Sequence, residues 1–263
     1  MNIIEREMVE VLKTLRNEYG VFEIKAEFEA EGSRIEEMMR LKDITSKVNL
    51  PIILKIGGVE AITDIYNGLS IGVKGIIAPM AESAFAVSKF LSSIETFVAE
   101  DNREDVDFAI NIETQTAYEN LDKIFALEKL PLLYGITIGR VDMVGSMGYD
   151  RSKVDGEEIS SMCRTIFQKA REKNLMTGLG GAISTGSISL IKSLLDDGLI
   201  DKYETRKVVF AADAIRKDPE AGILKAIEFE LLWLKSKRRY YAGIKAEDEH
   251  RIEMLEKRLT LKA

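Results

Sequence analysis

Apolar and polar positions follow two patterns along the chain. Short apolar runs, typical of buried strands, occupy residues 20–30, 51–58, 74–80, 106–114, 133–140, 175–181 and 207–213. The longer stretches between them carry apolar residues at helical spacing, as in the stripe formed by Ala84, Val87, Leu91 and Ile94. Strand and helix alternate over about 200 residues, which predicts a parallel sheet with helical crossovers.

The number of strand-like runs favours an α/β fold of the (β/α)8 TIM-barrel type. An open doubly wound sheet is the alternative, but its glycine signature G-x-G-x-x-G does not follow the first strand. No eighth strand is evident, and we expect the first helix or a short strand near Tyr19 to take its place. The predicted barrel covers residues 1–215.

The C-terminal region extends beyond what a barrel needs. Residues 216–263 are expected to form a helical arm, with one long helix from Pro219 and a second helix from Gly243 to about Leu259. The first helix is expected to bury one apolar face, made of Ile223, Ile227, Leu231 and Leu234.

Charged side chains occupy the inward positions of the predicted strands. In the fourth run, bulky residues at 108, 110 and 112 are expected to face the helices, so Asn111 and Glu113 point inward. The same alternation directs Lys25, Glu27, Glu29 and Lys55 to the interior. Buried charge is costly unless it is paired or binds an ion, and active sites of barrels lie at the carboxyl ends of the strands. A structural network of Lys–Glu pairs is the alternative interpretation.

Two carboxylates come from the ends of consecutive strands, Glu113 and Asp142. Without His or Cys nearby, such a pair suits Mg²⁺ or Mn²⁺, with water and substrate in the remaining positions. Lys55 adds positive charge for a small anionic substrate, and this combination suits an enolate derived from a 2-oxo acid. Glu113 alone has a second interpretation, an acid at the N-terminus of the following helix.

Composition narrows the class of protein. The 263 residues carry a net charge of -7, which argues against a nucleic-acid or anionic-membrane surface. The N-terminus has no signal-peptide pattern and no apolar run is long enough to cross a bilayer, so we expect a cytoplasmic protein. The lone Cys163 lies at helical spacing among apolar residues, which predicts a buried, inert thiol.

Two further stretches have open interpretations. Residues 177–187 are rich in Gly, Ser and Thr, which is typical of a phosphate-binding loop late in a barrel or of a flexible connection. Residues 235–241 form a basic cluster, explained either by a helix C-terminus, which favours positive charge, or by nucleic-acid or phosphate binding.

Four segments together resemble the HpcH/HpaI aldolase and citrate lyase β-subunit family: "VKGIIAPMAESAFAVSKF", "NIET", "ENLDKI" and "ITIGRVDMVGSMG". The resemblance covers about residues 20 to 150. It implies a phosphoenolpyruvate/pyruvate-type barrel that makes or breaks carbon–carbon bonds next to an enolate. It also implies that Glu113 and Asp142 bind Mg²⁺ and that the backbone from Gly139 and Arg140 to Asp142 contacts the substrate carboxylate.

The resemblance has two departures. Lys55 stands where family aldolases carry an arginine, and lysine lacks the planar bidentate fork. The acid–histidine pair after the first strand is absent, and the only histidine, His250, lies in the C-terminal arm. Glu27 or Glu29 is therefore expected to serve as the acid or base, and Asn111 to contact the substrate.

These observations predict a Mg²⁺-dependent carbon–carbon lyase or aldolase acting through an enolate of a small 2-oxo or dicarboxylic acid. One alternative is an acyl-CoA lyase of the citramalyl or malyl type. Another is a barrel that binds a small anionic ligand without turnover. Because citrate lyase β-type relatives pack a C-terminal helical segment against a neighbouring subunit, the resemblance also implies a homo-oligomer.

Overall fold

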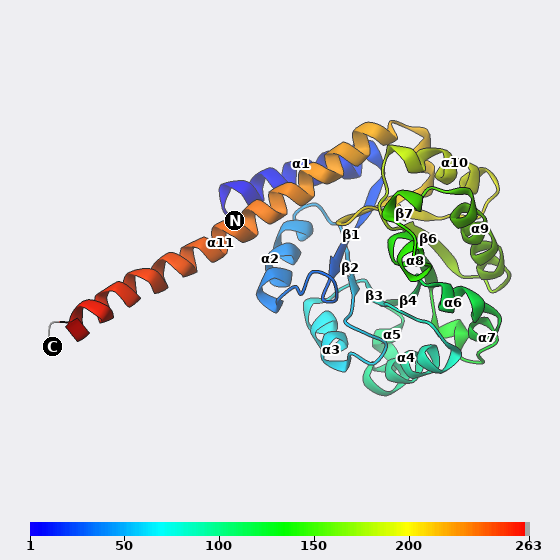
Figure 1. Ribbon diagram of the computed structural model, residues 1–263, viewed down its shortest axis with the longest axis horizontal. Coiled ribbons are helices and arrows are strands. Elements are labelled where there is room, and N and C mark those ends of the chain that lie inside the picture. The colour runs from blue at the N-terminus through cyan, green and yellow to red at the C-terminus, as the bar shows by residue number, and fades with distance from the viewer. Residues whose placement is uncertain (261–263) are drawn as a thin grey trace.

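The strands close into a barrel in the computed structural model, which describes residues 1–260. Eight strands follow one another around it in chain order (Figure 1). They are β1 (Val21–Glu27), β2 (Ile52–Lys55), β3 (Gly75–Ala78), β4 (Asp107–Ile112), β5 (Gly135–Gly139), β6 (Met176–Gly180), β7 (Lys202–Glu204) and β8 (Val208–Ala211). The predicted eight-stranded barrel with a C-terminal helix is thus confirmed.

Helices cover the outside of the barrel. The α-helices are α1 (Ile3–Tyr19), α2 (Ile35–Ser46), α3 (Ile62–Ile71), α4 (Ala84–Phe97), α5 (Glu100–Arg103), α6 (Gln115–Glu119), α7 (Leu121–Phe125), α8 (Arg140–Ser146), α9 (Glu157–Glu172), α10 (Ile188–Asp196) and α11 (Pro219–Thr260). Four short 3-10 helices complete the described elements: η1 (Leu130–Leu132), η2 (Arg151–Lys153), η3 (Thr185–Ser187) and η4 (Ala212–Arg216). Cys163 is buried in α9, and burial raises the pKa of its thiol to about 12.

The last two strands depart from a regular (β/α)8 repeat. β7 is the strand that the apolar pattern did not reveal, whereas Tyr19 lies in α1 and not in a strand. β1 to β7 run parallel, but β8 is antiparallel to both of its neighbours, β7 and β1. A tight turn joins β7 to β8, in which the Thr205 amide donates a hydrogen bond to the Val208 carbonyl at 3.0 Å. The barrel therefore closes with a hairpin in place of a final helical crossover.

Because side chains alternate along the strands, the protein has two buried apolar regions, one between the strands and the helices and one inside the barrel. Outward residues such as Ile24, Leu54 and Ile110 belong to the large core between strands and helices. Inside the barrel, Ile53, Ile77, Ala109 and Val209 form a small apolar cluster. On β2 and β4 the next inward residues toward the carboxyl ends are polar, so this cluster forms an apolar floor beneath a polar site.

α11 is one continuous helix, so the predicted break at Gly243 is wrong. Its first half lies beside α1, and its second half extends away from the barrel (Figure 1). Of the residues predicted to be buried, Ile223 is buried, whereas Ile227 and Leu231 are about half exposed in the single chain, at 53% and 49%. The buried side of the helix is instead formed by Gly222, Ile223, Ala226, Phe229, Trp233 and Ser236. No described helix is long and apolar enough to span a membrane.

The reversal of β8 determines where α11 runs. Because β8 is antiparallel, it ends at the amino-terminal edge of the other strands, and α11 begins there, with Gly222 against Tyr19 and Phe210. The helix then runs back along α1 toward the opposite edge of the barrel. There Tyr241 donates a hydrogen bond to Glu37 at 2.6 Å. The last helix thus reaches the face where the parallel strands end.

Candidate active site

A cavity of about 710 Å³ opens at the carboxyl ends of the parallel strands. Its charged lining consists of seven carboxylates and five basic side chains, so acids are in excess. The acids are Glu27, Glu29, Glu31, Glu113, Asp142, Glu204 and Glu230, and the bases are Lys25, Lys55, Arg151, Arg206 and Lys237. The strand alternation correctly directed Lys25, Glu27, Lys55, Asn111 and Glu113 to this interior.

Glu113 follows β4 and is only 1% exposed. Its Oε1 accepts a hydrogen bond from the Met80 amide at 2.9 Å, and its Oε2 accepts one from Asn111 Nδ2 at 3.0 Å. Burial raises the pKa of Glu113, Asp142 raises it further, and Lys55 only partly opposes them. A Cβ on Gly139 would lie 2.4 Å from Glu113 Oε2, so glycine at 139 leaves the room that this carboxylate needs.

Asp142 lies in the first turn of α8 and lines the same cavity as Glu113. Among the described residues, no group of three or more His, Cys, Asp or Glu side chains is arranged to hold a metal. Two carboxylates nevertheless fit Mg²⁺ or Mn²⁺, which usually keep several waters and bind substrate oxygens. The raised pKa of Glu113 also fits, because a nearby cation stabilises an ionised buried carboxylate. Glu113 and Asp142 are therefore the residues able to hold a hard cation.

Lys55 ends β2 and is buried, at 5% exposure. Its Nζ lies 2.9 Å from Glu29 Oε2. Burial lowers the pKa of Lys55, but the charges of Glu113 and Glu27 outweigh burial and leave the pKa above its ordinary value. The Lys55 ammonium is thus positively charged at neutral pH and faces the cavity beside Glu113.

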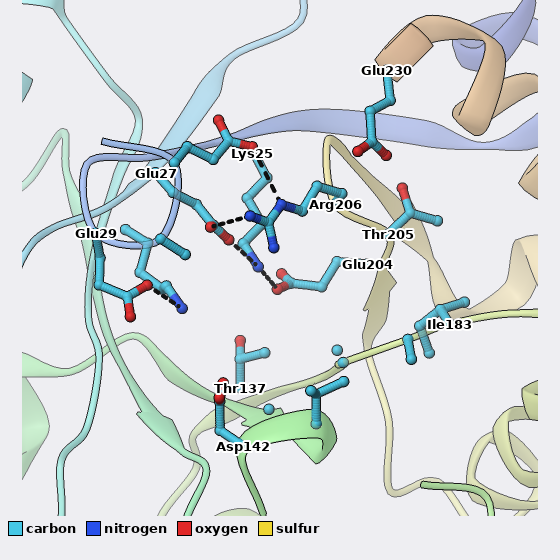
Figure 2. Close-up of a pocket in the computed structure, with 18 of the residues that line it drawn as sticks. Lys25, Glu27, Glu29, Thr137, Asp142, Ile183, Glu204, Thr205, Arg206 and Glu230 are labelled. Carbon is cyan, nitrogen blue, oxygen red and sulfur yellow. Dashed lines mark hydrogen bonds and ion pairs between the residues drawn. The ribbon is translucent and has the colours of Figure 1, made fainter. Parts of the chain in front are cut away.

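A second charged group, built on Lys25, lies across the cavity from Asp142 (Figure 2). Lys25 Nζ lies 2.5 Å from Glu204 Oε1 and 3.1 Å from Glu27 Oε1. Burial raises the pKa of Glu27, yet Lys25, Lys55 and Arg206 together bring it below its ordinary value. The second oxygens of Glu27 and Glu204 are buried and accept no hydrogen bond from the described residues.

A family model described as HpcH/HpaI aldolase/citrate lyase matches residues 34–181, more than half of the chain. The protein belongs to this family. The resemblance seen in the sequence is therefore confirmed, and family membership supports a lyase or aldolase type of reaction. No curated protein matches the chain in sequence.

Solved structures of similar fold include three enzymes. The HpcH/HpaI aldolase from Desulfitobacterium hafniense DCB-2 is 14% identical, with 84% of this chain and 88% of that chain covered and a TM-score of 0.60. Citrate synthase SbnG is 17% identical, with coverages of 89% and 91% and a TM-score of 0.62. Macrophomate synthase is 14% identical, with coverages of 90% and 82% and a TM-score of 0.58. These likenesses establish the shared fold.

The side chain of Arg140 has a structural role, whereas the predicted contact of its backbone with the substrate stays a prediction. Its side chain is fully buried, at 0% exposure, and does not line the cavity. The guanidinium donates hydrogen bonds to the carbonyls of Gly180 at 3.1 Å and Gly181 at 2.9 Å, to Asp155 Oδ1 at 2.5 Å and to Ser187 Oγ at 3.0 Å. With its donors committed to the protein, the side chain is not available to a substrate carboxylate.

The same contacts hold the glycine-rich stretch 177–187 in place, which comprises most of β6 and the loop that follows it. Arg140 donates one hydrogen bond to the Gly180 carbonyl and another to Ser187 Oγ, so it contacts this stretch at two points. A Cβ on Gly181 would lie 2.5 Å from the Arg140 amide nitrogen, so this glycine packs directly on the start of α8. The loop is therefore tied to α8 and is not a loose connection.

Several cavity residues were missed by the sequence reasoning. Glu204 and Arg206 lie on β7 and its turn, and Glu230 and Trp233 lie on α11. Thr137 was identifiable, because it alternates with apolar neighbours on β5. The basic cluster at 235–241 lies in the middle of α11, so the helix C-terminus explanation is wrong; its Lys237 pairs with Glu37 at 2.9 Å.

Proposed function

We propose that this protein is a Mg²⁺-dependent carbon–carbon lyase or aldolase that acts through the enolate of a small 2-oxo or dicarboxylic acid. The observation that carries the proposal is Glu113, a buried carboxylate with a raised pKa that lines one cavity together with Asp142 and Lys55. In a member of the HpcH/HpaI family, this combination supports binding of a cation and an anion next to each other.

Each residue has a separate task in this proposal. Glu113 and Asp142 would hold the cation, which when bound supplies positive charge to an enolate oxygen. Lys55 binds a carboxylate or enolate oxygen of the substrate through its ammonium group. Asn111 orients Glu113 through its hydrogen bond, and Gly139 keeps the substrate side of α8 open.

We assign proton transfer to Glu29. Its side chain is 28% exposed and contacts Lys55, so it lies between the cavity and solvent. Glu27 is less suited to this role, because Lys25, Lys55 and Arg206 lower its pKa and keep it ionised. Glu29 therefore replaces the missing acid–histidine pair in this mechanism.

The acidic lining argues against the acyl-CoA alternative. The phosphates of coenzyme A favour a basic surface, whereas carboxylates outnumber basic side chains around this cavity. A barrel that binds its ligand without turnover is distinguished by experiment.

The decisive measurement is exchange of the methyl protons of pyruvate in D₂O, followed by NMR with Mg²⁺ and with EDTA. We expect Mg²⁺-dependent exchange, together with decarboxylation of oxaloacetate. The Glu113→Gln variant serves as the control and is expected to lose both. Pyruvate binding without exchange at any metal concentration would favour the non-catalytic alternative.

We also propose a homo-oligomer assembled through the second half of α11. That segment exposes apolar side chains, namely Ile244, Ile252, Leu255 and Leu259, and isolated helical segments gain most of their stability from packing. Removing residues 243–263 is expected to lower the mass in solution to that of the monomer while the barrel stays folded. An unchanged mass, measured by light scattering, would contradict this assembly.

A further inference from the structure

The cavity has two sides of different chemistry. One side carries Glu113, Asp142 and Lys55, where the proposed enolate forms. The other is formed by Glu27 of β1, Glu204 of β7 and Glu230 of α11, which we call the acceptor side (Figure 2). Binding cavities of several hundred Å³ accommodate ligands of drug size, so 710 Å³ leaves room for a substrate that reaches both sides.

The basic groups on the acceptor side already face carboxylates. Lys25 lies between Glu27 and Glu204, at 3.1 and 2.5 Å. Arg206 faces Glu27 at 3.9 Å and Glu31 at 3.4 Å. Lys237, as described above, pairs with Glu37. Lys25 and Lys237 are thereby committed to carboxylates, whereas Arg206 contacts its two carboxylates at longer range.

Hydrogen-bond acceptors, in contrast, remain unused. Glu27 and Glu204 are only 2% and 3% exposed, yet one oxygen of each accepts no hydrogen bond from residues 1–260. Glu230, which is only partly buried, lines the same side of the cavity and forms no ion pair within the same residues. A buried acceptor without a donor costs free energy, so the free oxygens of Glu27 and Glu204 favour a ligand that donates.

We propose that the acceptor side binds hydrogen-bond donors of the substrate, hydroxyl or ammonium groups, and disfavours a second carboxylate. The inference deepens the proposed function, on which it rests, by specifying the end of the substrate remote from the enolate. Arg206 covers Glu27 only loosely, since their 3.9 Å contact is too long for a hydrogen bond and the arginine side chain is 47% exposed. A donor on the ligand displaces this arginine and takes its place at Glu27.

A set of unreactive six-carbon acids tests the preference directly. Hexanoate, 6-hydroxyhexanoate, 6-aminohexanoate and adipate share one carboxylate and differ at the far end. Their binding is measured by NMR titration of the full-length protein with Mg²⁺ present. We expect the hydroxyl or amino acid, or both, to bind about ten-fold more tightly than hexanoate, as one hydrogen bond to a charged group provides, and adipate to bind most weakly.

Substitutions on the acceptor side locate the effect. Glu27→Gln and Glu204→Gln each leave Lys25 with one glutamate partner, so the fold is expected to persist. In both variants 6-aminohexanoate should lose most of its affinity advantage over hexanoate, because the introduced amide carries no charge. The affinity advantage of 6-hydroxyhexanoate should fall less. Glu23→Gln is the matched control: Glu23 is a buried glutamate of β1 that pairs with Lys202 and lies outside the cavity lining. It should leave the order of binding unchanged.

The outcomes separate this inference from the proposed function. Adipate binding as tightly as the donor-bearing acids, or donor-bearing acids binding no better than hexanoate, would overturn the acceptor side. Loss of the preference in Glu23→Gln as well would overturn its location. Absence of proton exchange in pyruvate, with the preference intact, would instead overturn the proposed chemistry.

Discussion

Glu113 and Arg140 are both buried charged residues at the carboxyl edge of the barrel, and they differ in how completely the protein satisfies them. Arg140 is surrounded by acceptors from three segments and pairs with Asp155. Glu113 accepts two hydrogen bonds from uncharged groups, and its pKa is raised because its burial is not offset.

The difference separates a structural charge from a functional one. A buried charge with every donor used stabilises a local arrangement, and removing it leaves the partners unsatisfied. A buried charge that the protein leaves uncompensated is stabilised by something from outside, which for Glu113 is the proposed cation. Burial alone does not distinguish the two, since both side chains are at or below 1% exposure.

The largest expected effect is on stability, in Arg140→Met. The substitution leaves Asp155 without its cationic partner and the carbonyls of Gly180 and Gly181 without this donor, so we expect a loss of about 3–5 kcal/mol in the free energy of unfolding. Urea denaturation measures it. Arg140→Lys keeps the charge and should recover part of the loss. A fully stable Arg140→Met protein would show that Arg140 is not the structural member of the pair.

Glu113→Gln is expected to lower activity and to maintain stability, the reverse of Arg140→Met. Without one of the two proposed metal ligands, turnover should fall by about a hundred-fold or more, and Mn²⁺ binding followed by electron paramagnetic resonance should weaken in parallel. Stability at neutral pH should be maintained, because Asn111, whose Oδ1 is unpartnered, is able to rotate its amide and accept from the introduced amide. Unchanged Mn²⁺ affinity would remove Glu113 from the metal site.

Lys55→Met tests whether Lys55 is a structural charge, like Arg140, or a functional one, like Glu113. If Lys55 holds a substrate oxygen, the loss of one charge-assisted hydrogen bond lowers affinity or rate by roughly 10- to 150-fold. Lys55→Arg should retain part of the activity. If Lys55 is a structural residue like Arg140, the methionine variant instead lowers the melting temperature, because Glu29 and Glu113 lose their cation. A stable variant with undiminished turnover would contradict the assignment.

The smallest effect is the pH dependence of stability in metal-free protein. Because burial raises the pKa of Glu113 in the folded state, its contribution is fully present below the ordinary carboxyl pKa and is lost as pH rises through the raised value. The free energy of unfolding of the wild type should therefore fall relative to Glu113→Gln over this range. If the free energy of unfolding varies with pH in the same way in both proteins, burial of Glu113 has no cost. Addition of Mg²⁺ should reduce the difference between the two proteins.

The sequence pattern was sufficient for every strand except β7, but not for the closure of the barrel. β1 to β6 and β8 are apolar enough to identify, whereas β7 has three residues, two of them charged. Strand direction leaves no trace in composition, so the reversal of β8 was not predictable. The break expected at Gly243 failed because glycine only weakens a helix, and here the helix continues through it.

Among the candidate site residues, too, some were predictable from the local sequence pattern and others were not. Glu113 and Lys55 were found because strand alternation is a local property that the fold preserves. Glu204 was missed because β7 was not recognised as a strand, and Glu230 because its place depends on the path of α11. The structural role of Arg140 also lay outside local pattern, since its partners lie up to 47 residues away in sequence.

The path of α11 also affects how the protein is completed during synthesis. A chain is made from its N-terminus, so every strand of the barrel leaves the ribosome before residues 227–237, which form part of the cavity wall. The nascent protein thus has its proposed metal ligands before it has a finished entrance to the cavity. The proposed ligand selection at the α11 wall is therefore acquired after the proposed metal ligands are in place.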